Sequence, residues 1–382
     1  MKPTTYPKSI IYILALGVFG IITTEFGIIG ILPEIAANFH VSIAHAGWLV
    51  TAFALVIAVF GPFVTLAASK LNRKLALSIV LVVFVLSNLL SMLATSFPIL
   101  MIARILPAFF HPVFFSVAMA TAALSAKPGE GPKAVSIVFS GVSIGTVLGV
   151  PIVAFFADQF DWKAAFLISS IITGVALVFL LRFLPSLPVN HKLSFESQLS
   201  ILKKAKTWWS IGVVTLFITG MATSYSYMAE YLKETVKMDG RTVSLALLLF
   251  GAAGVFGNIL LGRLLTKSIG SAVWSFFTGL IIVQGLLYIS GAHLYTSLVL
   301  TAIWGFIHTG GFLLGQTLIT HSSPEAPEFS SSIFVSTGNL GFSLGSIFGG
   351  LALEAIGVNN LPLVSITVLL VAAAAYLLQD RL

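Results

Sequence analysis

The sequence is poor in charged residues and has no cysteine. Only 9% of its 382 residues are charged and 58% are hydrophobic, whereas a soluble domain has roughly 25% charged residues. A soluble protein of this composition would lack the polar groups to cover its surface, so the excess of apolar side chains must face lipid. The absence of cysteine excludes disulfide scaffolds, cysteine nucleophiles and metal sites built on cysteine.

Signals of catalysis and cofactor binding are also missing. The sequence contains no phosphate-binding loop of the Walker type, so ATP is not expected as the energy source. No His, Asp and Glu residues have the spacing of metal ligands, and no nucleophile and base converge in one motif. We therefore expect neither an enzyme nor a bound metal or cofactor.

Long apolar runs occupy most of the chain. A helix needs roughly 20 apolar residues to cross a bilayer, and the breaks between runs predict an all-α membrane protein with twelve transmembrane helices. The predicted spans are 9–33, 46–69, 75–95, 98–124, 133–157, 164–184, 208–231, 242–266, 271–291, 295–320, 330–353 and 360–379. The tenth and eleventh are rich in Gly, Ser and Thr, which leaves a count of ten or eleven open.

The basic residues are distributed unevenly between the two ends of these spans. With the N-terminus inside, most of the 20 Lys and Arg residues fall on the inner side, while Lys163, Lys233, Lys237 and Arg241 fall outside and Arg104 lies within a span. This bias predicts a multi-pass protein of the cell inner membrane with both termini in the cytoplasm. It also explains the net charge of +7 without a nucleic-acid partner.

The longest polar stretch divides the spans into two sets of six. We predict an N-terminal six-helix bundle over 1–184, a cytoplasmic linker over 185–207 and a C-terminal bundle over 208–382. Both halves have a glycine-rich fifth span, with Gly141, Gly145 and Gly149 in the first and Gly341, Gly345 and Gly349 in the second. Spacing of four places each set on one helix face, where small residues let helices approach closely. The glycines serve packing alone, or they also form a moving contact between pseudo-symmetric bundles.

Several segments together resemble the major facilitator superfamily, and within it the bacterial twelve-span proton-coupled efflux transporters for drugs, sugars and purines. The sharpest resemblance is the first-span segment 24–36, which reads TEFGIIGILPEIA; the segments 104–111, 141–151 and 161–166 resemble the fourth-span, fifth-span and sixth-span motifs of that family. The resemblance covers essentially the whole chain. It implies the major facilitator fold and alternating access between two bundles.

The loop after the second span departs from the family pattern. Thr65, Ser69 and Asn72 stand where the family usually has Gly, Asp and Gly, although Lys70, Arg73 and Lys74 keep the positive charge. In the fifth span, Thr146 replaces a typical proline before Gly149 and Pro151. The resemblance implies that Lys70, Arg73, Lys74, Gly141, Gly145, Gly149 and Pro151 belong to motifs that act in conformational change.

Ionisable residues inside spans are costly and therefore indicate function. Glu25 lies in the first span with apolar residues on both sides, and a buried carboxyl group that can take up and release a proton suits proton coupling. Arg104 in the fourth span is expected at a similar depth, and His111 follows it. We assign proton coupling to Glu25, Arg104 and His111. The alternatives are a structural Glu25, an Arg104 that snorkels or binds main-chain carbonyls, and a structural His111.

Polar residues in the second half predict a solute-binding cavity. Tyr225 and Tyr227 in the seventh span suit a wall that stacks on a ring and donates a hydrogen bond. His308, Gln316 and Asn339 are polar groups in other helix interiors and need partners. We expect a small, neutral or amphipathic solute, protons and the bilayer as partners, and a monomer. The leading hypothesis is a proton-driven exporter of a sugar, nucleoside, purine or drug; the alternatives are an importer of the same fold and a non-transporting receptor.

Overall fold

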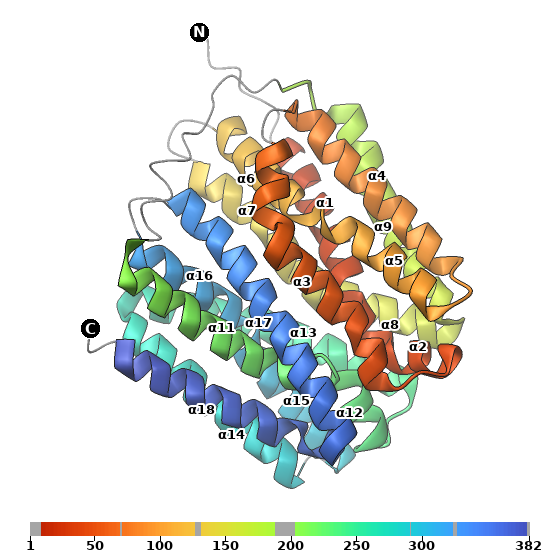
Figure 1. Cartoon of the computed structure of the whole chain (residues 1–382), viewed down its shortest axis with the longest axis vertical. Helices are drawn as coiled ribbons and strands as arrows, with labels where there is room; N and C mark the ends of the chain where they lie inside the picture. Colours follow the sequence, from red (N-terminus) through yellow and green to blue (C-terminus); the bar gives the residue numbers. More distant parts are fainter. Residues whose placement is uncertain are drawn as a thin grey trace. The chain divides into compact units, whose positions relative to one another are not determined.

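The computed structural model describes residues 9–68, 71–126, 131–187, 203–290, 292–323 and 327–379. Across these ranges the secondary structure is helical and includes no strand. In the part of the chain that the structure describes, twelve segments are long and apolar enough to cross a membrane. Figure 1 shows the arrangement of the helical ribbons. The predicted fold class and the count of twelve spans are confirmed, and the alternative of ten or eleven is set aside.

Six spans are formed by one main helix each. They are α3 (Ile43–Ala68), α4 (Arg73–Met92), α9 (Trp162–Phe183), α13 (Gly240–Lys267), α14 (Ile269–Ser290) and α17 (Pro327–Ile356). The twelfth span adds a short 3₁₀ turn, η4 (Val358–Asn360), before α18 (Leu361–Gln379).

The other five spans are interrupted. The first consists of α1 (Ser9–Gly27), the 3₁₀ turn η1 (Ile28–Ile31) and α2 (Leu32–Phe39). The fourth is α5 (Phe97–Ala108) and α6 (His111–Ser125), and the fifth is α7 (Gly131–Ile144), the π-helical η2 (Gly145–Gly149) and α8 (Val150–Gln159). The seventh is α11 (Ala205–Tyr225) and α12 (Met228–Glu234), and the tenth is α15 (Leu294–His308) and α16 (Gly310–Ser322).

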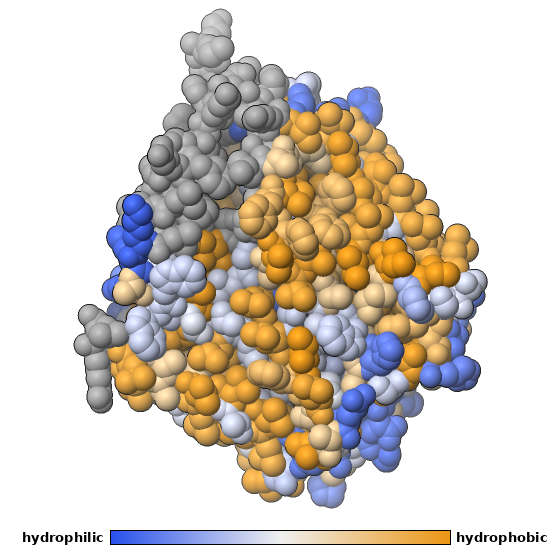
Figure 2. Space-filling view, in the orientation of Figure 1, coloured by the Kyte–Doolittle hydropathy of each residue, from blue (hydrophilic) through white to orange (hydrophobic). Residues whose placement is uncertain are grey.

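Large apolar side chains cover the outside of these helices. Phe63, Ile102 and Ile289 are 69%, 70% and 80% exposed, and Figure 2 shows wide areas of hydrophobic side chains on one face. Exposed apolar area on this scale is unsuited to water and matches the hydrocarbon of a bilayer.

The chain forms two compact units. Unit 1 consists of residues 1–28 and 59–192, and unit 2 of residues 29–58 and 193–382. In unit 1, α1 packs on α7, η2 and α9, and α4 packs on α9. In unit 2, α11 packs on α17 and α18, which lie beside it in Figure 1, and α13 packs on α15. The predicted division at residues 184 and 207 remains a prediction, because residues 188–202 of its linker lie outside the described ranges.

The glycine-rich fifth span of unit 1 and the glycine-rich eleventh span of unit 2 pack in the same way. A Cβ atom on Gly141, Gly145 or Gly149 would meet α1 around residues 15–23, and one on Gly341, Gly345 or Gly349 would meet α11 around residues 215–223. The two sets of contacts therefore correspond residue for residue, and we call positions related in this register equivalent. The glycines allow close packing of two helices within one unit, while a role in movement between bundles stays a prediction.

These glycines also form the pattern Gly-x-Ser-x-Gly, around Ser143 and Ser343. In serine hydrolases this pattern forms a sharp strand-to-helix turn that exposes the serine. Here Ser143 lies within α7 and Ser343 within α17, so neither segment forms such a turn.

Candidate functional site

The candidate proton site of unit 1 lies where two spans are interrupted. Glu25 is close to the end of α1, and His111 is the first residue of α6. Pro107 and Pro112 flank the break between α5 and α6. Proline lacks a main-chain N–H and disrupts the helical ladder, which accounts for the interruption.

Arg104 binds the last turn of α1. Its Nη1 donates to the carbonyl oxygen of Thr24 at 2.6 Å and its Nη2 to that of Glu25 at 3.3 Å. Arg104 is only 2% exposed. Carbonyl groups at the C-terminal end of a helix lack partners within the helix and carry partial negative charge, so a buried guanidinium is well placed there. The contacts agree with the alternative that Arg104 binds main-chain carbonyls.

The Glu25 carboxylate pairs with His111. Its Oε2 lies 2.9 Å from His111 Nε2, and the side chains of Glu25 and His111 are 10% and 4% exposed. The ring of Phe115 stacks on His111 with a centroid separation of 4.6 Å. Two groups that both change charge on protonation thus meet in an apolar part of the unit.

Two polar side chains extend this arrangement from neighbouring helices. Asn88 of α4 donates to the Thr24 hydroxyl oxygen at 3.0 Å, and that hydroxyl group donates to the carbonyl oxygen of Gly20 at 3.1 Å. Asn88 is 1% exposed. The three predicted residues Glu25, Arg104 and His111 are therefore brought together at the α1 break. Asn88 and Thr24 were not among the predicted site residues.

Unit 2 holds aromatic residues at the equivalent positions. Tyr225 is equivalent to Glu25 in the register of the glycine contacts, and it is the last residue of its helix, α11. Trp304 is equivalent to Arg104 when the end of α5 at Ala108 is aligned with the end of α15 at His308. Tyr225 contacts the rings of Phe250 at 5.3 Å, His308 at 4.8 Å and Phe342 at 6.2 Å between centroids. His308 is 2% exposed, and neither of its ring nitrogens has a hydrogen-bond partner among the described residues. We call Tyr225, Phe250, Trp304, His308 and Phe342 the aromatic cluster.

The remaining predicted solute-binding residues lie apart from this cluster. Tyr227 is 1% exposed and donates to the carbonyl oxygen of Ser346 at 3.0 Å, with its ring against Gly349 and Gly350. Asn339 is half-buried and donates to Val335 O in its own helix, and Gln316 is half-buried on α16. Sequence reasoning placed Tyr225 and Tyr227 on one wall, but the helix ends between them and they point to different neighbours.

The residues assigned to conformational motifs lie at two places in unit 1. Asn72 caps α4 and donates to the Ser186 hydroxyl oxygen at 2.7 Å. Lys74 Nζ donates to Leu181 O at 2.8 Å, and Arg73 N to Leu187 O at 3.1 Å, so the loop is held against the end of α9. Pro151 is buried at the start of α8. Lys70 lies outside the described residues.

A second ion pair lies in unit 2. Glu34 of α2 and Lys233 of α12 form a salt bridge, with each side chain 23% exposed. Ser42 donates to Glu354 Oε1 at 2.8 Å close to the start of α3. Residues 29–58 are therefore tied to α12 and α17 by polar contacts.

Within the described ranges, no group of three His, Asp or Glu residues could hold a metal ion.

Three comparisons define the class of protein. The profile of the Major Facilitator Superfamily matches residues 14–337 and 214–381, two matches that begin at equivalent positions of the two halves. The chain is 31% identical over 354 residues to an uncharacterized MFS-type transporter, YfhI, of Bacillus subtilis (strain 168), in a match that covers 92% of this chain and 88% of the relative.

Solved structures agree on the fold. A bacterial homolog of the human lysosomal transporter Spinster, inward-facing and occupied, gives a TM-score of 0.81 at 18% identity, and the match covers 100% of this chain and 98% of that one. The nucleoside transporter NupG gives 0.80 at 13% identity, covering 97% and 99%. The family match and the twelve candidate spans in the described ranges identify a multi-pass membrane transporter. The chain belongs to the Major Facilitator Superfamily.

Proposed function

We propose that this protein is a proton-coupled antiporter that exports a small neutral or amphipathic solute, such as a sugar, nucleoside, purine or drug, by alternating access. The observation that supports it is the buried pair of Glu25 and His111 beside Arg104. Ionisable groups at this depth are costly unless they serve a purpose, and a carboxylate paired with an imidazole can accept and release a proton.

Proton uptake at this pair would change the packing of the first and fourth spans. With Glu25 ionised, its carboxylate is held by His111 at 2.9 Å. Protonation of the carboxyl group removes its charge and weakens that contact, while Arg104 remains bound to the carbonyl oxygens of α1. The α1–η1 and α5–α6 breaks are points at which the two spans can bend, because their hydrogen-bond ladders are interrupted there.

We place solute recognition at the aromatic cluster of unit 2. The cluster carries no fixed charge, and His308 has two ring nitrogens without partners among the described residues. Aromatic faces suit stacking, and ring nitrogens suit hydrogen bonds with hydroxyl or amide groups. Tyr225 and His308 are the strongest candidates from the predicted set; Tyr227 is better explained by its packing, and Gln316 and Asn339 remain half-buried candidates.

Alternating access needs contacts that form and break. The Glu34–Lys233 salt bridge and the bond between Ser42 and Glu354 tie residues 29–58 to α12 and α17. We propose that these contacts hold one end of the transport pathway closed. In the bilayer we propose a monomer in the cell inner membrane with both termini in the cytoplasm, as the distribution of Lys and Arg indicates.

The test is proton movement in proteoliposomes. With an imposed pH gradient, wild-type protein and Glu25→Gln are challenged with panels of sugars, nucleosides, purines and drugs. The proposal predicts that one class of solute drives proton flux in the wild type and that the substitution abolishes this flux. Solute uptake down the proton gradient would indicate the importer, and no solute-dependent proton movement with any panel would contradict proton antiport.

A further inference from the structure

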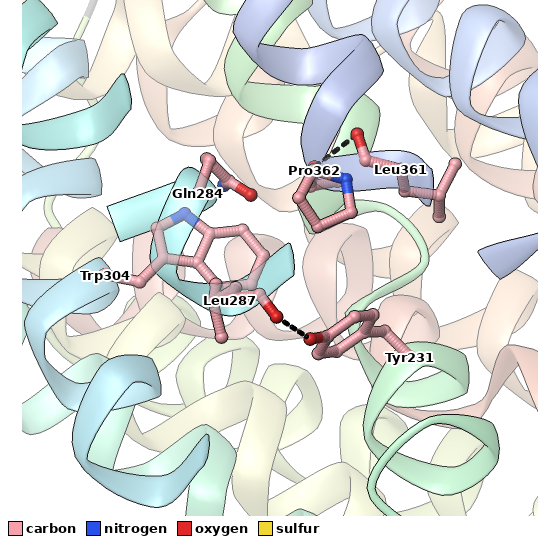
Figure 3. Close-up of a pocket in the computed structure, with 7 residues that line it drawn as sticks. Tyr231, Gln284, Leu287, Trp304, Leu361 and Pro362 are labelled. Carbon is pink, nitrogen blue, oxygen red and sulfur yellow. Dashed lines mark hydrogen bonds between the residues drawn. The ribbon is translucent and has the colours of Figure 1, made fainter. Parts of the chain in front are cut away.

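Unit 2 contains a small pocket among four of its spans. Figure 3 shows the pocket with the Gln284 side chain and the Trp304 indole ring on one side and Leu361 and Pro362 on the other. Ser224, Tyr231 and Leu287 complete its lining. The cavity has a volume of about 10 Å³, and roughly 10–15 Å³ is the least volume that holds one water molecule.

Two residues that line the pocket, Gln284 and Trp304, carry polar atoms that the described residues leave without partners. Gln284 is 0% exposed, and neither its amide nitrogen nor its amide oxygen has a hydrogen-bond partner there. Trp304 is 2% exposed, and its Nε1 likewise has none. An unpaired buried polar group costs about 1–3 kcal/mol, so three such atoms at one pocket call for a ligand.

Two further oxygens at the pocket can accept a hydrogen bond. The Ser224 hydroxyl donates to Leu361 O at 3.2 Å, and the Tyr231 hydroxyl donates to Leu287 O at 2.8 Å. Each hydroxyl oxygen keeps lone pairs after donating its hydrogen. The lining therefore offers N–H donors on Trp304 and Gln284 and oxygen acceptors on Gln284, Ser224 and Tyr231. A ligand that fits must be the size of one heavy atom and must both donate and accept.

We propose that a single ordered water molecule occupies this pocket, accepting from the indole N–H of Trp304 and donating to the amide oxygen of Gln284. Its second hydrogen is directed to the hydroxyl oxygen of Ser224 or Tyr231. Buried waters typically make about three hydrogen bonds to groups that otherwise lack partners. The water thus joins α14 and α15 to either α11 or α12, and it positions Trp304, a member of the aromatic cluster, without taking part in proton coupling.

The experiment is structure determination of the full chain in lipid nanodiscs, without added solute, at a resolution that shows ordered water. The variants are Gln284→Leu and Trp304→Phe. Gln316→Leu is the control, because it makes the same chemical change on α16 outside the pocket. We expect one peak in the wild type and in the control, at roughly 2.7–3.2 Å from Trp304 Nε1 and the Gln284 amide, and loss of that peak in Gln284→Leu.

The other outcomes are equally decisive. If Gln284→Leu does not fold, Trp304→Phe replaces it, and loss or displacement of the peak on removal of the indole N–H supports the proposal. The proposal is overturned if the wild-type pocket shows no density while other buried waters are visible. A Gln284 amide rotated into a direct bond with Trp304, or density larger than one water, overturns it as well.

Discussion

The two units place different chemistry on the same backbone design. In unit 1, Glu25 lies near the end of α1, with Arg104 on the carbonyl groups of that helix and His111 on its carboxylate. At the equivalent positions, unit 2 has Tyr225 at the end of α11 and Trp304 in the aromatic cluster. An interrupted helix end can therefore hold ionisable groups, because its free carbonyl groups stabilise a cation. It can equally hold aromatic rings, which need no such stabilisation.

From this contrast we propose proton coupling in unit 1 and solute recognition in unit 2. Each unit has a row of glycines on one helix face, which we call its glycine face. Gly141, Gly145 and Gly149 bring the fifth span against α1, and Gly341, Gly345 and Gly349 bring the eleventh span against α11. The helix packing is the same in both units, and the side chains at the ends of α1 and α11 differ in chemistry. Substitutions can test each half of this division separately.

The largest effect is expected from removal of the buried cation. Arg104→Leu leaves the carbonyl oxygens of Thr24 and Glu25 without their donor, and each buried polar group that loses its partner costs about 1–3 kcal/mol. Thermal unfolding in detergent should show a strong loss of stability. Trp304→Leu at the equivalent position of unit 2 removes no charge and should cost less; an equal or greater loss there would break the comparison.

A second prediction tests whether the two glycine faces behave alike. Gly145→Ala and Gly345→Ala would bring a Cβ atom within 2.6 Å of a side-chain carbon of Ile22 and of Ala222 respectively. Overpacking of this kind costs about 1–3 kcal/mol. Gly212→Ala and Gly270→Ala, which meet nothing within 4 Å, are matched controls.

The controls should be neutral or stabilising, because Ala favours a helix over Gly by about 1 kcal/mol. Thermal unfolding of all four variants decides the point. Similar losses for the variants at Gly145 and Gly345 would sharpen the comparison, and a loss in only one of them would show that the two faces differ.

A third prediction concerns recognition in unit 2. His308→Phe keeps a ring against Tyr225 but removes both ring nitrogens. If these nitrogens bind the solute, the apparent affinity should fall about tenfold, the equivalent of one lost hydrogen bond of about 1.4 kcal/mol. The number of protons moved per solute should stay the same. Transport measured against solute concentration checks this, and a change in that ratio would contradict the assignment.

The smallest effect is expected at Asp239, an ionisable residue of unit 2 between two spans. Its carboxylate accepts from Thr242 N at 2.8 Å and caps α13, and hydrogen bonds with Thr242 lower the pKa of Asp239 below its ordinary value of 3.8. Because the pKa is lower in the folded state, the contribution is present above pH about 4 and is lost as the pH falls through the folded value. Asp239→Asn should remove this small dependence from thermal unfolding curves and leave proton-coupled flux unchanged.

The sequence predicted the fold well, because the fold depends on local signals, while the roles of the predicted site residues stay predictions. Long apolar runs define spans, and Glu25 and Arg104 stand out as charges within such runs. The pairing of Glu25 with His111 depends on contact between α1 and α6, which no local pattern specifies. A role of Tyr227 in solute binding stays a prediction. The end of α11 separates Tyr227 from Tyr225, and the residues around it do not indicate that end.

Gln284 and Trp304 were missed for a different reason. An amide or an indole in an apolar helix is common, so the sequence does not indicate a binding role. That role is inferred from the unpaired atoms of residues that line one pocket. Trp304 could have been found from the repeat, since it occupies the position that Arg104 occupies in the first half. That signal requires the register between the two halves, which the packing of the glycine faces makes plain.

Two activities of the same proteoliposomes test most directly whether coupling lies in unit 1 and recognition in unit 2. Solute counterflow without a pH gradient reports recognition, and solute-driven proton flux reports coupling. We predict that Glu25→Gln retains counterflow but loses proton flux. We predict that His308→Phe has weakened counterflow and an unchanged proton-to-solute ratio. Proton flux that survives in Glu25→Gln, or coupling lost in His308→Phe, would contradict the division of roles between the two units.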